Sequence, residues 1–127
     1  MELKRGHDYK GLVCLYEGIG VAFIMIAINW SSVNPGWGPI AVGCTVAGAI
    51  TCFDQPSGSH FNPAVTLAQY FYRSWELKKN FLFAISIIMS QILGGAVGVF
   101  IVYLTLDQDD IKDNKIPGVA ILCPPLS

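Results

Sequence analysis

Three long runs of apolar residues dominate the chain, and short polar segments separate them. They cover Leu12–Ile28, Pro39–Phe53 and Phe81–Leu106, and a shorter apolar run extends from Pro63 to about Tyr72. About 20 apolar residues make a helix that crosses a bilayer, so the shorter run cannot cross alone. Its backbone is tolerated at membrane depth only where protein surrounds it. The pattern predicts an all-α membrane protein with three transmembrane helices and one re-entrant half-helix.

A few polar and small residues interrupt these runs. Glu17 lies inside the first run and Gln91 inside the third. A carboxyl group at such a position is costly unless it finds partners, so we expect Glu17 to face the helix bundle and to have a function. Gly94 and Gly98 have the spacing of a helix-packing face. The second run has small residues that also allow close helix contact, namely Gly43, Ala47 and Gly48.

The polar turn before the short run has the features of a helix start. Asn62 is expected at the N-cap, where its side-chain oxygen accepts a hydrogen bond from a backbone N–H group. Pro63 fits the first helical position, because the N–H group that proline lacks has no partner there. The N-terminus of such a helix carries partial positive charge. In a water-filled cavity, this turn would be a pore element.

Composition supports burial in a membrane. Of the 127 residues, 53% are hydrophobic and 13% are charged, and the mean hydropathy is +0.50. The net charge of −1 gives no reason to expect a nucleic-acid partner. The four cysteines, Cys14, Cys44, Cys52 and Cys123, have no metal-ligand spacing, so we interpret them as small buried hydrophobic residues. The sequence shows no recognisable catalytic nucleophile with a general base and no cluster of metal ligands. We therefore expect no enzyme activity, no cofactor and no metal.

The flanking segments divide the chain into three parts. Residues 1–11 form a short polar segment before the spans, residues 12–106 form the membrane unit, and residues 107–127 are an acidic linker with a proline-bounded tail. Within the membrane unit, Asn29–Gly38 is predicted to be a surface loop, because Trp30 and Trp37 favour the membrane interface.

Ser57–Thr66 (Ser-Gly-Ser-His-Phe-Asn-Pro-Ala-Val-Thr) resembles the first signature loop of the aquaporin, or major intrinsic protein, family. The resemblance implies that the half-helix dips to the bilayer midplane and that Glu17 and Gln91 support the loop. It also implies that His60 acts through its backbone carbonyl and its packing. The residues that it places along a pore are Gly58, Ser59, His60, Asn62, Pro63, Ala64 and Val42.

Two departures from the family pattern bear on selectivity and on the loop. Val42 stands where water-selective members usually carry an aromatic ring, which implies a wider or more apolar constriction. At the entrance to the loop the chain has Asp54-Gln55-Pro56, where the family usually has a glycine-histidine pair. We also expect the return after the half-helix, near Arg73, to be longer than in relatives.

The resemblance covers one of the two inverted repeats of complete members. One repeat cannot enclose a pore, because backbone polar groups of its loop would face lipid. Six basic residues lie on the side of the N-terminus and two on the other, which predicts a cytoplasmic or mitochondrial-matrix N-terminus. This bias argues against a symmetric homodimer inserted in both orientations. Besides membrane lipid, we therefore expect another membrane chain to cover the open face.

Two functions remain open from the sequence. The first is a half-channel that conducts water or a small neutral solute once a complementary partner is present. The second is a non-conducting structural subunit of a larger membrane complex, built on an aquaporin-like scaffold.

Overall fold

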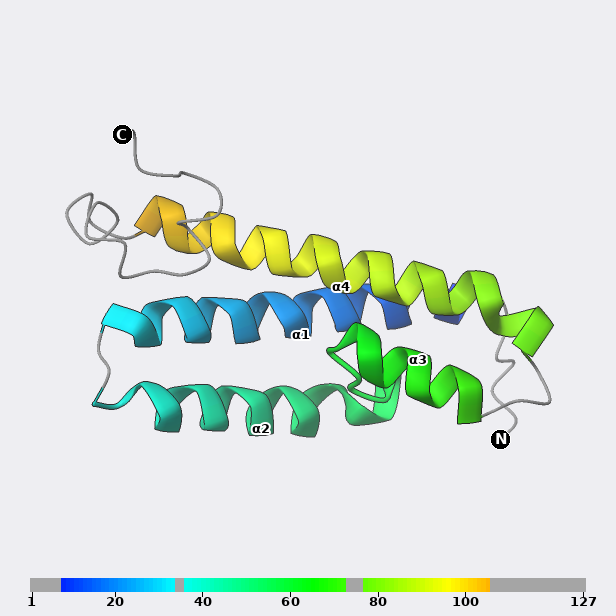
Figure 1. Cartoon of the computed structure of the whole chain (residues 1–127), viewed down its shortest axis with the longest axis horizontal. Helices are drawn as coiled ribbons and strands as arrows, with labels where there is room; N and C mark the ends of the chain where they lie inside the picture. The colour runs from blue at the N-terminus through cyan, green and yellow to red at the C-terminus, as the bar shows by residue number, and fades with distance from the viewer. Residues whose placement is uncertain (1–7, 34–35, 73–76, 106–127) are drawn as a thin grey trace.

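The computed structural model describes residues 8–33, 36–72 and 77–105. These residues form four helices, α1 (Asp8–Val33), α2 (Gly38–Ser57), α3 (Pro63–Tyr72) and α4 (Leu77–Thr105). At 1.5 Å per residue, the three long helices extend for about 30–43 Å and α3 for about 15 Å. Figure 1 shows the long helices lying side by side and the short α3 beside the part of the bundle where α1 begins. The segments expected before residue 8, around Arg73 and at 107–127 lie outside the described residues.

α3 has the predicted limits, α1 and α2 extend beyond theirs at both ends, and α4 begins four residues before Phe81. α1 begins four residues before Leu12 and ends at Val33, so the first part of the predicted loop Asn29–Gly38 is helical. The polar side chains there bond to their own helix: Asn29 Nδ2 donates to the Met25 carbonyl at 2.7 Å and Ser31 Oγ to that of Ile28 at 2.7 Å. Polar residues therefore do not end the helix.

The second helix ends later than the sequence suggests. Asp54, Gln55 and Pro56, expected at the entrance to the loop, lie in the last turn of α2. Gly58 closes this helix in the left-handed conformation, with φ of 88°, and its N–H donates to the Asp54 carbonyl at 2.9 Å. Only residues 58–62 therefore connect α2 to α3.

Glycines bring α1 and α4 into close contact. A Cβ atom at Gly94 would collide with the backbone carbonyl of Gly18, and one at Gly98 would lie 2.6 Å from the Ala22 carbonyl oxygen. Gly94 and Gly98 thus lie where the backbones of α1 and α4 approach each other closely. Farther along α4, Val99 and Val102 are buried against α1.

α2 contacts α1 through one side and leaves the other open. A Cβ atom at Gly43 or at Gly48 would meet nothing within 4 Å, and Ala47 is exposed. The close contact that these small residues allow is therefore not made within the described part of the chain. Cys44 and Cys52 are also exposed. The expectation that they are buried is wrong for this chain by itself, because both belong to the open side of α2.

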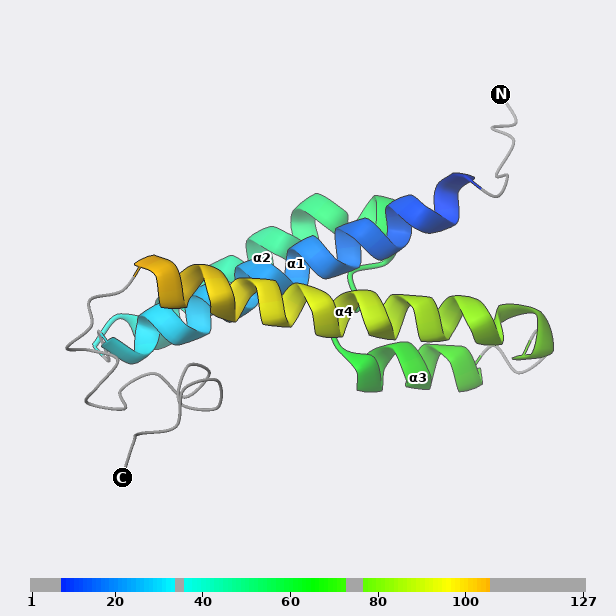
Figure 2. The same cartoon turned by 90° about the horizontal axis from the view of Figure 1, so that it is seen from above.

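The arrangement places α3 beside the first half of α4. The two helices are in contact, as Figure 2 shows from above. α3 continues in the direction of α2, and α4 then returns parallel to α1 (Figure 1). The turn before α3 consequently lies near the middle of the bundle, and the last residues of α3 lie at the end where α1 begins.

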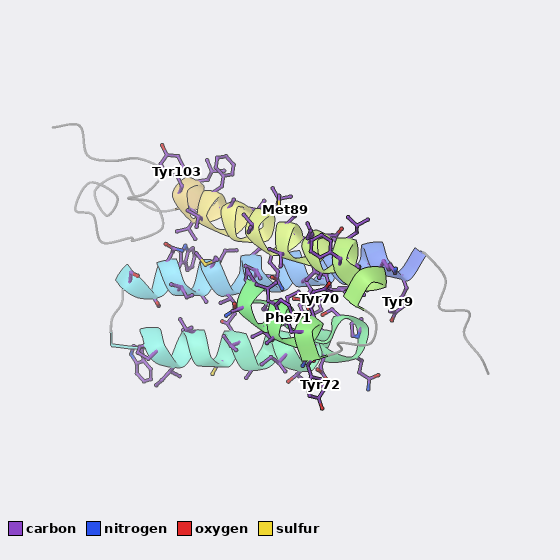
Figure 3. The ribbon with its side chains drawn as sticks, turned by 45° about the vertical axis from the view of Figure 1, so that its right-hand side comes forward. Tyr9, Tyr70, Phe71, Tyr72, Met89 and Tyr103 are labelled. Atoms are coloured by element: carbon purple, nitrogen blue, oxygen red, sulfur yellow. The ribbon has the colours of Figure 1, made fainter. Side chains whose placement is uncertain are left out.

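Among the described residues, two helices are long and apolar enough to cross a membrane. They are the α1 segment Tyr9–Ser32 and the α4 segment Phe81–Thr105, each with a mean hydropathy of 2.2. Figure 3 shows Tyr9 towards one end of the bundle and Tyr103 at the other. Aromatic residues at both ends of long apolar helices are typical of membrane proteins.

Candidate functional site

The Glu17 carboxylate holds the loop between α2 and α3. Its Oε1 accepts hydrogen bonds from Ser57 Oγ at 2.8 Å and from the His60 N–H at 2.9 Å. Its Oε2 accepts from the Phe61 N–H at 2.7 Å and from Gln91 Nε2 at 2.9 Å. Glu17 is fully buried, and these four donors surround its two oxygens. Glu17 thus contacts α2, the loop and α4 through one carboxylate.

The loop needs this support because its backbone is strained. Ser59 has φ of 47° and Phe61 has φ of 45°, both in the left-handed region. That conformation costs about 1–2 kcal/mol for a residue with a Cβ atom. Hydrogen bonds from His60 and Phe61 to one carboxylate offset this cost and fix the path of the chain into α3. Ser59 adds a bond from its N–H to Ser57 Oγ at 3.1 Å.

Asn62 caps α3 in the predicted manner. Its side-chain Oδ1 accepts a hydrogen bond from the Ala64 N–H at 2.8 Å, and its backbone carbonyl accepts from the Thr66 N–H at 3.0 Å. Pro63 is the first residue of the helix. Asn62, Pro63 and Ala64 are all exposed, so the start of α3 and its partial positive charge are accessible at the surface of this chain.

A second buried group joins the loop to α4. Gln91 Nε2 donates to Glu17 Oε2 and, at 3.0 Å, to Thr66 Oγ1. The His60 Nδ1 atom lies 3.3 Å from the same Thr66 oxygen. Gln91 Oε1 is buried and finds no partner among the described residues. The two N–H groups of the Gln91 amide are thus both used to hold the loop and the first turn of α3.

Aromatic packing completes the support on the α1 side. The Phe61 ring lies against Gly20, where a Cβ atom would collide with it. The Phe53 and Phe61 rings meet edge to face, with centroids 6.1 Å apart, and Phe53 also stacks on Tyr16 at 5.6 Å. Gly20 is therefore required for the close approach of the loop to α1.

Val42 lies away from this loop. It is half-buried in the first part of α2, and Gly58 comes 16 positions later, which corresponds to about 24 Å of helix. The structure brings Glu17, Gln91 and the loop residues together and does not bring Val42 to them. The pore-lining role of Val42 and of the loop residues stays a prediction.

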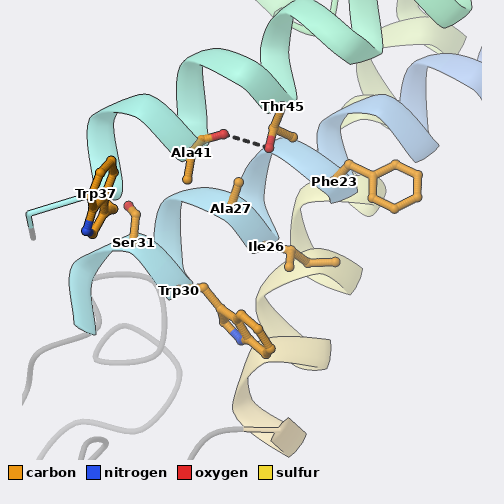
Figure 4. Close-up of a pocket in the computed structure, with 9 residues that line it drawn as sticks. Phe23, Ile26, Ala27, Trp30, Ser31, Trp37, Ala41 and Thr45 are labelled. Carbon is orange, nitrogen blue, oxygen red and sulfur yellow. Dashed lines mark hydrogen bonds between the residues drawn. The ribbon is translucent and has the colours of Figure 1, made fainter. Parts of the chain in front are cut away.

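A separate groove lies between α1 and α2 near the turn that joins them (Figure 4). Its volume is about 410 Å³ and its lining is mostly apolar. The Thr45 hydroxyl in its wall donates to the Ala41 carbonyl at 2.8 Å, so it is satisfied within α2. The predicted site residues lie elsewhere, and the groove lining comprises Phe23, Ile26, Ala27, Trp30, Ser31, Trp37, Gly38, Ala41 and Thr45.

Two contributors to the site were not singled out from the sequence. Thr66 is buried and bonds to three neighbours, and Ser57 donates to Glu17. Thr66 could have been noticed as the one aliphatic hydroxyl of α3, four residues after the cap. Within the described ranges, no group of three His, Cys, Asp or Glu side chains is placed to hold a metal ion.

Comparisons with known proteins find sequence similarity to one family. The family model described as "Major intrinsic protein" matches residues 10–121. A probable glycerol uptake facilitator protein of Thermotoga maritima is 36% identical over 117 residues, which are 88% of this chain and 47% of that protein. An aquaporin of Laccaria bicolor is 42% identical over 76 residues, and aquaporin-4 of Mus musculus is 35% identical over 65.

These matches differ in extent. The fungal match covers 59% of this chain and 20% of the relative, and the mouse match covers 51% and 19%. The chain thus spans about half or less of the length of these curated relatives. No solved structure gives a significant match. Because the family model covers most of the sequence, the chain belongs to the major intrinsic protein family and is an integral membrane protein.

Proposed function

We propose that this chain forms one half of a channel for water or a small neutral solute, and that a second membrane polypeptide completes the pathway. The observation that carries the proposal is the loop held by Glu17, which presents the capped start of a half-length helix. Asn62 is exposed there, next to Pro63 and Ala64. An amide and a positive helix end would hydrogen-bond a passing neutral molecule and disfavour cations.

The lengths of the helices support a transmembrane placement of α1, α2 and α4. In α1, Tyr9 and Trp30 are separated by about 32 Å of helix, and in α4 Phe81 and Tyr103 by about 33 Å. Both values match a hydrocarbon core of about 30 Å flanked by interfacial aromatic residues. α2 contains 20 residues, about 30 Å of helix. With this placement α3 is re-entrant. The excess of basic residues on the side of the N-terminus favours a cytoplasmic or mitochondrial-matrix position for that end.

The open side of the molecule supports the need for a partner. Asn62, Ala64 and the preceding Gly58 are exposed, as are large apolar side chains of α3 such as Phe71. In a bilayer, lipid could not satisfy the polar groups of this turn, at a cost of several kcal/mol. A membrane chain that covers this side would line the other wall of the pathway.

The printed names of the relatives suggest the solute class. They include aquaporins and a glycerol uptake facilitator. Valine at position 42 is small and cannot hydrogen-bond, which favours a path that also admits glycerol. We therefore propose Val42 as part of the constriction and Gly58, Ser59 and His60 as pore-lining residues beside Asn62, Pro63 and Ala64.

Flux measurements on a completed assembly test the proposal. The chain would be fused to the remaining half of the Thermotoga maritima protein, reconstituted in liposomes, and compared with the chain alone in water- and glycerol-driven swelling. We expect rapid swelling from the fusion and none above the lipid background from the chain alone.

Asn62→Asp is the matched variant, because it keeps the N-cap acceptor and places a negative charge at the start of α3. We expect it to lower neutral-solute flux by about tenfold or more, as a charge holds its water more strongly than an amide does. If the folded fusion carries neither water nor glycerol, the channel function is wrong, and a non-conducting structural subunit becomes the better proposal.

A further inference from the structure

Thr66 occupies the centre of the hydrogen-bond network and has no role in the proposal above. It is the buried residue of α3, with 2% of its surface exposed, whereas its helix neighbours Val65 and Leu67 are more than 40% exposed. Its Oγ1 atom lies 3.0 Å from Gln91 Nε2, 3.3 Å from His60 Nδ1 and 3.2 Å from the Asn62 carbonyl oxygen. One hydroxyl therefore joins α4, the loop and the cap of α3.

The number of hydrogens available determines the direction of each bond. The Gln91 amide has two N–H groups, one for Glu17 and one for Thr66, so Thr66 Oγ1 accepts from Gln91. The single hydroxyl hydrogen of Thr66 is donated to the Asn62 carbonyl. With the hydroxyl hydrogen on the Asn62 carbonyl, the His60 tautomer that carries its hydrogen on Nδ1 completes the set by donating to Thr66 Oγ1.

We propose that Thr66 is a positioning residue that fixes both the Asn62 cap and the tautomer of His60. The Asn62 carbonyl accepts from the Thr66 N–H at 3.0 Å as well as from its hydroxyl, so Thr66 holds the residue whose amide faces the pathway. This inference rests on the proposed function for its effect on flux, but its effect on His60 and Asn62 is independent of conduction.

Thr66→Val and Thr66→Ser separate the hydroxyl from the shape of the side chain. Valine keeps the branched shape and loses all three hydrogen bonds, whereas serine keeps the hydroxyl. Thr45→Val is the matched control, because the Thr45 hydroxyl bonds only within its own exposed helix. The chain has two histidines, so His7→Gln in every sample leaves His60 as the single imidazole.

Nitrogen-15 NMR of the histidine ring and of the Asn62 side-chain amide reads the proposed effect directly. We expect the parent chain to show a hydrogen on His60 Nδ1. Thr66→Val should move this signal toward the other tautomer and shift the Asn62 amide, while Thr66→Ser and Thr45→Val leave both in place. Unchanged His60 and Asn62 signals in a folded Thr66→Val protein would overturn the proposal.

Flux through the completed assembly provides the second measurement. Thr66→Val loses the bonds that fix Asn62 and should lower flux about tenfold, and Thr66→Ser should restore it. A tenfold change corresponds to about the free energy of one buried hydrogen bond. An altered NMR signal with unaltered flux would also overturn the positioning role. If the parent assembly does not conduct, the channel function fails, and the NMR result alone decides the role of Thr66.

Discussion

Replacing Glu17 with alanine is expected to produce the largest loss of stability of any single change in the site. Four donors, from Ser57, His60, Phe61 and Gln91, would lose their acceptor at once. A buried donor without a partner costs about 1–3 kcal/mol, and part of the loop can relax, so we expect a total of about 3–6 kcal/mol. Thermal unfolding in detergent, followed by circular dichroism, should show a midpoint lower by more than about 10 °C.

Two further variants make this result specific. Glu17→Gln keeps one carbonyl acceptor, so its midpoint should lie between those of the parent and Glu17→Ala. Asp54→Ala removes an exposed carboxylate from the end of α2 and should leave the midpoint nearly unchanged. If Glu17→Ala and Asp54→Ala lowered the unfolding midpoint equally, net charge, and not the hydrogen bonds to the loop, would determine stability.

The second large effect is expected from Gly94→Ala. The added methyl group would collide with the Gly18 backbone, and neither helix has a flexible side chain there that could move aside. Overpacking of this kind costs about 1–3 kcal/mol, and the separation of α1 and α4 should increase. A lower unfolding midpoint, together with a longer distance between spin labels on α1 and α4, would show both consequences.

Gly95→Ala is the matched control at the next position. A Cβ atom there would lie 3.6 Å from Val21 Cγ1 and 3.8 Å from Met25 Cγ, which is ordinary contact. Because alanine favours a helix over glycine by up to about 1 kcal/mol, Gly95→Ala should be neutral or slightly stabilising. If both variants lose the same stability, the close approach of Gly94 to Gly18 does not hold α1 and α4 together.

Much of this fold could be predicted from the sequence because the strongest signals are local. The start of α3 follows from Asn62 and Pro63, whose side chains act within one helical turn. The packing of Gly94 follows from its spacing with Gly98. By contrast, the end of α2 was misplaced, because Pro56 is tolerated in a last turn that Gly58 closes. The end of α1 also lies later than expected. The polar side chains after Ile28 donate hydrogen bonds to carbonyl groups of their own helix and so continue it.

The site was less accessible to sequence reasoning because its contacts join distant parts of the chain. Glu17 could be singled out as a carboxylate in an apolar run, but its partners were implied by family resemblance and not by spacing. Thr66 gave little signal, since a threonine in a short apolar helix is ordinary, and its three neighbours come together only in the folded chain. The exposed face of α2 likewise depends on which side of that helix packs against α1.

The order of synthesis gives the Glu17 network a consequence for biogenesis. Ser57, His60 and Phe61 are made at least 40 residues after Glu17, and Gln91 is made 74 residues after it. While the ribosome is still translating α2, the first helix therefore carries a carboxyl group whose eventual donors do not yet exist. Water must supply its hydrogen bonds in the meantime, and the full set of protein donors is complete only after Gln91 has been synthesised.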